Sequence, residues 1–334
     1  MMSTGGGTAQ RRLLVVGSGF IAAAVARAAA DDWGWPVAGI YRHYNNPDFE
    51  GLPCHQLPPT VAQLMQLIAQ INPTDIIVSL GSSFVPEINR NLDSALSEHL
   101  NGPMLILDAV SRLQRPLTGK IIVIGSASEY GEFDDDPINE QHPPRPRDHY
   151  GLIKLSLRHI GLHYQQQHGL PVIHVRQFNV TGAAQDSRFV LPSICRQIAQ
   201  ATRHRAEGVA HRIVAGNISV RRDFLAIEDV CAAYRTLLLS GTAGEVYNVC
   251  SGRAYRIADL IALAGEVAQL QVDVEVSTQL LRENDKVQSN ICGDPAKLML
   301  LGWSPKVQMR ELITQMIENY SAAGQTDCRH PETH

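Results

Sequence analysis

The sequence predicts an α/β protein in which a doubly wound parallel sheet is followed by a smaller α/β domain. Two observations carry this prediction. Through the first half of the 334 residues, short apolar runs rich in β-branched residues alternate with helical patterns, which is the rhythm of βαβ units. After about Phe178 the strands become shorter and mix with amphipathic helices, so we expect a second domain there.

The first domain is expected to span residues 1–178, with residues 1–10 as a loose tail. Leu13–Val16 is predicted as its first strand, and a glycine-containing turn leads from it to the alanine-rich helix Ile21–Ala30. Further strands are expected at Val37–Tyr41, Ile76–Leu80, Ile121–Gly125 and Val172–Arg176. Helices are expected at Thr60–Ile71, at Pro86–Leu113 with an interruption near Gly102, and at Tyr150–Tyr164.

The second domain is expected to span residues 179–325, with about 225–245 packing back on the first domain and 326–334 as a loose tail. Its strands are expected at Arg212–Ala215, Val246–Val249 and Val272–Val276. Its helices are expected at Leu191–Ala201, Ile227–Leu239, Ile257–Ala268 and Val307–Tyr320. Parallel sheets of this kind bind ligands at the carboxyl ends of their strands, so the functional residues are sought there.

Composition excludes several classes of function. Hydrophobic residues make up 44% of the chain, which supports a folded core, and a net charge of -4 gives no reason to expect nucleic acid or an anionic membrane as a partner. No apolar stretch is long enough for a membrane span, and Met1–Arg12 lacks the apolar core of a secretory signal. The six cysteines are scattered without zinc-ligand spacing, so we expect reduced thiols, no metal site and a cytoplasmic location.

The first candidate site is the turn Gly17-Ser18-Gly19-Phe20-Ile21-Ala22, which reads G-x-G-x-x-A between a strand and a helix. Glycines let the backbone approach a pyrophosphate, and the helix N-terminus favours its negative charge. A tight turn without a ligand is the alternative, but the position after the first strand of a βαβ series favours a dinucleotide. Gly17, Gly19, Phe20 and Ile21 are therefore predicted to bind the cofactor.

The end of the second strand bears on which dinucleotide is used. An NAD site usually has an Asp or Glu here for the ribose 2′-hydroxyl, whereas this strand ends Ile40-Tyr41-Arg42-His43. Arg42 can pair with a 2′-phosphate instead. The sequence therefore predicts NADP (NADPH), with NAD as the alternative.

The strongest group of residues is Ser126 with Tyr150 and Lys154. Ser126 follows the strand Ile121–Gly125, and residues four apart, such as Tyr150 and Lys154, share one helix face. A phenol with a pKa near 10 exchanges protons poorly at neutral pH, so its pKa must fall by about two to three units, and an adjacent ammonium together with a nicotinamide cation can supply this. Ser126, Tyr150 and Lys154 are predicted to be catalytic.

Several other segments accompany these residues. They are the loop Ser126-Ala127-Ser128-Glu129-Tyr130-Gly131, the run from Pro143 to Lys154, Arg176-Gln177-Phe178-Asn179 and Arg221-Arg222-Asp223-Phe224. In them the chain resembles the extended short-chain dehydrogenase/reductases that modify nucleotide sugars. Tyr247–Gly252, Arg282–Asp285, Asp294-Pro295 and Leu301–Trp303 are most similar to the GDP-6-deoxy-4-keto-mannose reductase branch and its dehydratase relatives.

The resemblance implies a Rossmann-type NAD(P)-binding domain and a C-terminal substrate-binding domain. It also implies NADPH-dependent reduction of the 4-keto group of a nucleotide-activated 4-keto-6-deoxyhexose, a GDP-sugar above all. Leu80 and Gly81 join the predicted cofactor site, Ser128 and Asn179 orient the hexose, and Arg222, Arg282 and Asp285 hold the nucleotide diphosphate. The helices Leu92–Leu113 and Tyr150–Tyr164 would pair across a two-fold axis, giving a homodimer through a four-helix bundle.

The chain departs from its relatives at a few positions. Ser128 stands where similar dehydratases carry an acid, so dehydration is disfavoured, because it needs a positioned proton donor for the leaving hydroxyl. His99 replaces a usual Asn, and the glycine turn is one residue short. Two alternative functions remain: an NAD-dependent nucleotide-sugar 4-epimerase, and a non-catalytic dinucleotide-binding sensor, although such sensors typically lose the Tyr or the Lys.

Overall fold

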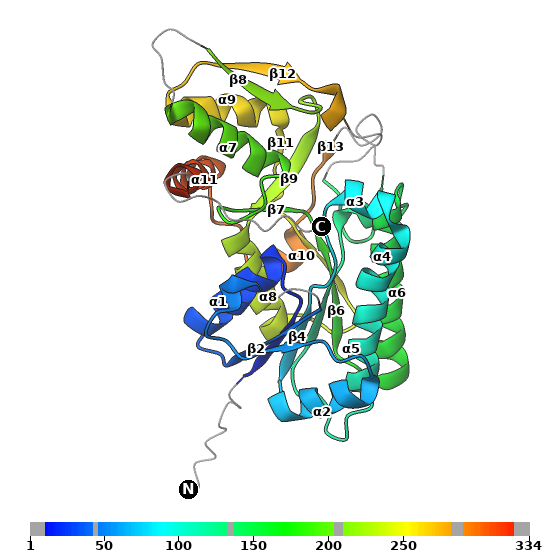
Figure 1. Ribbon diagram of the computed structural model, residues 1–334. Coiled ribbons are helices and arrows are strands. Elements are labelled where there is room, and N and C mark those ends of the chain that lie inside the picture. Colours follow the sequence, from blue (N-terminus) through cyan, green and yellow to red (C-terminus); the bar gives the residue numbers. More distant parts are fainter. Residues whose placement is uncertain (1–10, 43–45, 132–136, 204–209, 282–289, 324–334) are drawn as a thin grey trace, which may run out of the picture. The chain divides into compact units, whose positions relative to one another are not determined.

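A computed structural model defines the fold and describes residues 11–42, 46–131, 137–203, 210–281 and 290–323. The chain divides into two compact units. Unit 1 comprises Met1–Gly125, Leu152–Val175 and Tyr234–Tyr247, and unit 2 comprises Ser126–Gly151, Arg176–Ala233 and Asn248–His334. Figure 1 shows helices packed around a central sheet in unit 1, as the predicted α/β class requires.

Unit 1 is built on a seven-stranded sheet in the order β10-β6-β5-β4-β1-β2-β3. From β6 to β3 every neighbouring pair of strands runs parallel, so the predicted doubly wound parallel sheet is confirmed. The strand order reverses between β1 and β4, and this switch point is where such sheets bind ligands. The strands are β1 (Leu13–Val16), β2 (Val37–Tyr41), β3 (Cys54–Gln56), β4 (Asp75–Val78), β5 (Ile121–Ile124), β6 (Val172–Gln177) and β10 (Val246–Val249).

The strand sequences explain these positions. The central strands β1, β4 and β5 are buried along their whole length, which accounts for their runs of Leu, Ile and Val, interrupted only by Asp75 at the start of β4. The edge strand β3 is short and only partly buried, and its sequence Cys54-His55-Gln56 carries no β-branched residue. The strand β10, expected among those of the second domain, is the other edge of this sheet.

Helices cover both faces of the sheet, with α1 on one side and α5 and α6 side by side on the other (Figure 1). The helical segment expected over Pro86–Leu113 is also divided before Gly102, because Asn91 leaves helical geometry and its side chain accepts a hydrogen bond from the Ser94 N–H. Gly102 and Pro103 begin α5 after a π-helical turn. The helical elements with residues in unit 1 are α1 (Phe20–Asp31), η1 (Pro47–Phe49), α2 (Val61–Ile71), α3 (Val85–Arg90), α4 (Leu92–Leu96), η2 (Ser97–Asn101), α5 (Gly102–Ser111), α6 (His149–His168) and α8 (Ile227–Ser240).

The helix α1 follows the glycine turn and faces the core with small side chains. Ala22, Ala26 and Ala29 are fully buried, and Gly19 is the N-cap residue. Small residues on this face let the helix axis lie close to the sheet. The N-terminus of α1 is thereby held at the carboxyl end of β1.

Unit 2 contains two smaller sheets. In one, β9 pairs with β11, β13 and β7, and in the other β12 runs parallel to β8. Its core is formed by α7, α9 and α11 with β8 and β9. The elements are η3 (Ala127–Glu129), β7 (Asn179–Thr181), α7 (Val190–Arg203), β8 (His211–Ala215), β9 (Arg221–Ala226), β11 (Ala254–Arg256), α9 (Ile257–Ala268), β12 (Val272–Val276), η4 (Thr278–Leu280), β13 (Asn290–Ile291), α10 (Ala296–Met299) and α11 (Met309–Ala323). Among the helices that the structure describes, none is long and apolar enough to cross a membrane.

Candidate active site

The glycine turn lies at the carboxyl end of β1, beside the switch point. Gly17 has a φ of 128°, and a Cβ atom at this position would overlap the Ser79 backbone oxygen after β4. Only glycine fits this close approach of two strand ends. Gly19 begins α1 with no side-chain cap, and a Cβ there would meet open space. Phe20 and Ile21 follow in the first turn of the helix, so the predicted cofactor residues of this turn lie together at one helix N-terminus.

Arg42 follows β2 at the same edge of the sheet. Its Nη2 donates a hydrogen bond to Ser97 Oγ at 2.7 Å, which fixes the direction of the guanidinium. Its Nη1 is buried and has no hydrogen-bond partner in the part of the chain that the structure describes. A buried donor without a partner is costly, and a phosphate oxygen is a suitable acceptor. These donors fit a dinucleotide that carries a 2′-phosphate.

Two further predicted cofactor residues, Leu80 and Gly81, follow β4. Gly81 has a φ of 88°, and a Cβ on it would overlap the imidazole of His99. His99 lies in the π-helical turn η2 and is 1% exposed. Burial, and then the charge of Lys154, lower the pKa of His99 to about 3. The imidazole is therefore neutral at physiological pH.

Lys154 lies in the second turn of α6 and is 5% exposed. Its Nζ donates a hydrogen bond to the Ile124 carbonyl oxygen at 3.0 Å, at the end of β5. This bond anchors the ammonium at the carboxyl edge of the sheet, where the predicted cofactor residues also lie. An ammonium held there can donate to ribose hydroxyls of a bound dinucleotide.

Ser126 follows β5 as the N-cap residue of the short helix η3. Its Oγ accepts a hydrogen bond from the Ser128 N–H at 3.1 Å, and its own N–H donates to Glu129 Oε1 at 2.9 Å. Because Oγ accepts this bond through a lone pair, the Ser126 hydroxyl can also act as a donor. Ser126 and Tyr150, both in unit 2, are also hydrogen-bonded to each other through their side chains.

Tyr150 lies in the first turn of α6 and is 8% exposed. Burial raises its pKa well above the usual value for a tyrosine, and the hydrogen bond with Ser126 acts in the opposite direction. The nearby carboxylates of Glu129 and Asp148 raise the pKa further. In this structure Tyr150 is a protonated phenol at neutral pH, whereas the sequence analysis expected its pKa to be tuned downward by Lys154 and the cofactor.

Sequence reasoning placed Glu129 and Arg176 in segments that resemble the family's, but it assigned neither residue a role. Glu129 is fully buried, and its Oε2 accepts a hydrogen bond from Arg176 Nε at 3.2 Å. The spacing from Ser126 to Glu129 matches the Ser-x-x-Glu pattern of a capping box, so the sequence did carry a signal for half of this arrangement. The partner Arg176 is 47 positions away, and no local pattern indicates the pairing.

The predicted sugar and nucleotide residues are less closely grouped. Ser128 follows Ser126 in η3, and Asn179 begins β7, whose register pairs it with Phe224 of β9. Arg222 lies two residues earlier on β9, and its Nη1 donates to the Arg221 carbonyl oxygen at 2.9 Å. Arg282 and Asp285 lie outside the described residues. In the described ranges no group of three or more His, Cys, Asp or Glu could hold a metal ion.

Comparison with known proteins decides the family. Residues 60–316 match the family model described as GDP-mannose 4,6 dehydratase. The chain belongs to this family. The GDP-6-deoxy-D-mannose reductase of Pseudomonas aeruginosa is 31% identical over 320 residues, which cover 93% of this chain and 98% of that protein. The GDP-6-deoxy-D-talose 4-dehydrogenase of Aggregatibacter actinomycetemcomitans is 26% identical over 258 residues, covering 76% of this chain and 83% of that protein.

Solved structures agree with this assignment. The structure of RMD from Pseudomonas aeruginosa complexed with NADPH is 27% identical and has a TM-score of 0.75, covering 93% of this chain and 99% of that one. A UDP-glucose 4-epimerase of Thermus thermophilus in complex with NAD is 21% identical and has a TM-score of 0.80 over 93% of this chain and 99% of that one, which supports the fold alone. The predicted resemblance to the extended short-chain dehydrogenase/reductases is confirmed. As a member of the GDP-mannose 4,6-dehydratase family, the chain is an NAD(P)-dependent oxidoreductase of nucleotide sugars.

Proposed function

We propose that this enzyme reduces the 4-keto group of a GDP-linked 4-keto-6-deoxyhexose with NADPH. The observation that carries the proposal is the Ser126–Tyr150 hydrogen bond at a buried, protonated phenol. Reduction of a ketone to an alcohol needs one hydride and one proton, so the enzyme needs a proton donor at the carbonyl oxygen. A phenol that is protonated at neutral pH is the form in which Tyr150 can donate.

Each residue of the site has a defined part in this reaction. When bound, the reduced nicotinamide supplies the hydride. The Ser126 hydroxyl donates a hydrogen bond to the developing oxyanion, and Tyr150 transfers its proton to that oxygen. Lys154 holds the nicotinamide ribose, and its positive charge stabilises the tyrosinate left after proton transfer.

The same site argues against dehydration. Elimination of water needs an acid that is free to protonate the leaving hydroxyl, and Ser128 occupies the position where similar dehydratases carry one. Glu129, one residue later, is fully buried, with one oxygen bonded to the Ser126 N–H and the other to Arg176. A carboxylate engaged in this way is not available to a substrate.

The 4-epimerase alternative uses the same residues in both directions. A tyrosine that donates a proton during reduction must accept one during the oxidation that begins epimerisation, so the substrate test below separates the two functions. The retention of both Tyr150 and Lys154 argues against a non-catalytic dinucleotide sensor.

NADPH is proposed over NADH because of Arg42. The buried Nη1 of this residue has no partner within the described ranges, while Nη2 is fixed by Ser97. A 2′-phosphate would give Nη1 a charged acceptor, which a 2′-hydroxyl cannot match. The relative solved with NADPH agrees with this choice.

The nucleotide diphosphate is proposed to bind Arg222, Arg282 and Asp285, with Ser128 and Asn179 toward the hexose. Arg222 is partly buried on β9 of unit 2, and its Nη1 is held by the Arg221 carbonyl oxygen at 2.9 Å. Arg282 and Asp285 lie outside the described residues, and their role is proposed from the family resemblance. The guanine base is proposed because two of the curated relatives are named for GDP-sugars.

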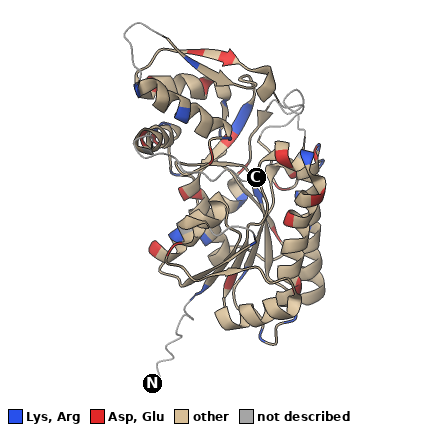
Figure 2. Ribbon diagram, viewed as in Figure 1, with Lys and Arg blue, Asp and Glu red and all other residues tan. Residues whose placement is uncertain are grey.

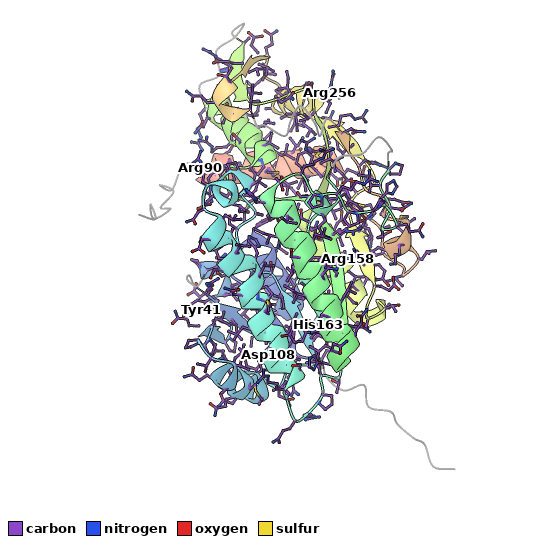
Figure 3. All side chains as sticks on the ribbon, turned by 90° about the vertical axis from the view of Figure 1, so that its right-hand side faces the viewer. Tyr41, Arg90, Asp108, Arg158, His163 and Arg256 are labelled. Atoms are coloured by element: carbon purple, nitrogen blue, oxygen red, sulfur yellow. The ribbon has the colours of Figure 1, made fainter. Side chains whose placement is uncertain are left out.

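We also propose that the enzyme is a cytoplasmic homodimer, paired through α4, α5 and α6 of each copy. Figure 3 shows α5 with Asp108 beside α6 with Arg158 and His163. Leu92, Leu96, Met104 and Leu152 on these helices are exposed apolar residues, between 38% and 54% exposed. Figure 2 shows few Lys or Arg and some Asp or Glu along these helices, so pairing is proposed to depend on the exposed apolar residues and not on charge. The five described cysteines are free thiols, which suits a reducing compartment.

A substrate panel tests the proposed function. Purified protein is incubated with NADPH or NADH and with 4-keto-6-deoxy sugars linked to GDP, dTDP or UDP, and the loss of reduced cofactor and the product alcohol are measured. We expect turnover with the GDP-sugar and NADPH. Conversion of a nucleotide sugar to its 4-epimer, with NAD bound in the purified protein, would instead establish the epimerase, and no reduction of any 4-keto sugar would refute the reductase.

A further inference from the structure

A buried carboxylate that takes no part in the proposed reaction lies against Ser126. Glu129 has an exposed fraction of 0%, and its Oε1 accepts the Ser126 N–H at 2.9 Å. The Ser126 side chain in turn accepts from a backbone N–H of the same turn, which makes a reciprocal capping box. The backbone that carries the Ser126 hydroxyl is therefore fixed from both ends of one helical turn.

The carboxylate is itself held by a buried network. Arg176, 1% exposed, donates from Nε to Glu129 Oε2 at 3.2 Å and from Nη1 to the Glu140 carbonyl oxygen at 3.3 Å. Its guanidinium lies 4.1 Å from the ring centre of Tyr130, whose hydroxyl donates to Asn248 Oδ1 at 2.7 Å. A capping box needs only the carboxylate. A buried ion pair behind it restricts the carboxylate to one position.

We infer that Glu129 is a positioning residue that, braced by Arg176, aims the Ser126 hydroxyl at Tyr150 and at the substrate oxygen. The expected effect on turnover rests on the proposed reductase function. The structural link from Glu129 to Ser126 does not depend on that function. Glu129 touches neither substrate nor cofactor in this assignment. Its effect passes through the Ser126 backbone.

Glu129 also acts on Tyr150 through its charge. The charges of Glu129 in η3 and of Asp148 just before α6 both raise the pKa of Tyr150, and Arg176 forms a buried ion pair with Glu129. Removal of the Glu129 charge should lower the pKa of Tyr150, because the tyrosinate would lose a repelling neighbour.

Three variants separate these effects. The paired change Glu129→Leu with Arg176→Met removes the carboxylate without leaving a buried cation, and such apolar exchanges of buried ion pairs are often neutral for stability. Ser126→Ala removes the hydroxyl that Glu129 is inferred to aim. Asp148→Asn is the matched control, because Asp148 Oδ1 accepts the Gly151 N–H at 2.7 Å and an asparagine keeps that bond while losing the charge.

The first measurement is hydrogen–deuterium exchange of the segment 121–131 in the full-length protein without substrate. We expect faster exchange in the paired variant and wild-type exchange in Asp148→Asn. Unchanged exchange in the paired variant would refute the positioning role, whatever the enzyme reduces. If the paired variant does not fold, Arg176→Lys takes its place, since it keeps a cation but loses the fixed guanidinium bonds, and the same direction is expected.

The second measurement is the steady-state rate with the accepted 4-keto sugar. The paired variant should lose about tenfold in kcat with little change in KM, because small misplacements of a catalytic group are costly. Ser126→Ala should lose about 100-fold. In the Ser126→Ala background the paired change should have almost no further effect on kcat, because the hydroxyl through which Glu129 acts is already absent. Additive losses would overturn the inference. A wild type that reduces no substrate would refute the proposed function while leaving the exchange result standing.

Discussion

Replacement of Tyr150 by phenylalanine tests the proton donor directly. The ring stays in place, so the buried site gains no cavity, and the loss is one hydroxyl with its Ser126 bond. A lost hydrogen bond of this kind costs about 1 kcal/mol of folding free energy, which lowers the melting temperature by only a few degrees. A missing general acid slows proton transfer by at least about 100-fold, or about 2.7 kcal/mol in activation free energy. Chemistry should therefore suffer far more than stability.

The assay is a single-turnover measurement of NADPH oxidation with saturating 4-keto sugar, together with thermal melting and NADPH titration. Tyr247→Phe is the matched control: Tyr247 is 3% exposed and its hydroxyl accepts the Thr242 N–H at 3.1 Å, away from the candidate site. Both variants should melt within a few degrees of the wild type, and only Tyr150→Phe should lose turnover. If Tyr150→Phe keeps more than about a tenth of the wild-type rate, Tyr150 is not the acid.

Four more changes test other parts of the molecule. Arg42→Asp should shift the kcat/KM preference from NADPH toward NADH, because a carboxylate repels a 2′-phosphate, and a wild type that already prefers NADH contradicts this. Arg282→Ala should raise KM for the nucleotide sugar with kcat nearly unchanged, and equal GDP affinity by titration calorimetry would contradict the phosphate role. Asp223→Ala should lower the free energy of unfolding of unit 2 by about 3 kcal/mol in chemical denaturation. The reason is that this buried carboxylate accepts hydrogen bonds from the Ser251 side chain and from three backbone N–H groups. A decrease of less than about 1 kcal/mol would contradict this. The folded-state pKa of His99, about 3, lies below its unfolded value of about 6.5, so this neutral imidazole contributes stability above pH 6.5 that is lost as pH falls below it. His99→Asn should flatten the pH dependence of melting between about pH 6.5 and 5, and equal slopes would argue against burial of a neutral imidazole.

The central strands were predictable from sequence because burial on both faces demands continuous apolar runs. The bounds of β1 and β2 match the prediction, and β5 ends one residue earlier than expected. The three-residue strand β3 was missed because Cys54-His55-Gln56 carries no β-branched pattern. Its position depends on parallel pairing with β2, which sequence periodicity does not report.

The candidate site likewise contains residues that the sequence could predict and residues that it could not. Gly17, Ser126 and Tyr150 could be predicted because a turn glycine, a strand-end serine and a helical Tyr-x-x-x-Lys are each recognisable as a local sequence pattern. Arg176 could not be assigned its role, since its pairing with Glu129 exists only once two distant segments meet. The direction of the Tyr150 pKa was equally out of reach, because burial decides it and burial is a property of the whole fold.

The alanine-lined face of α1 affects how a deep mutational scan of this enzyme should be interpreted. Ala22, Ala26 and Ala29 touch only the core, yet a valine at any of them would push α1 outward from the sheet. The helix N-terminus would move with it, away from the place where Gly17 and Gly19 leave room for a pyrophosphate. Such substitutions should score as losses of cofactor affinity at positions that no ligand contacts. A scan selected on activity would then outline the dinucleotide site partly through residues that lie behind it.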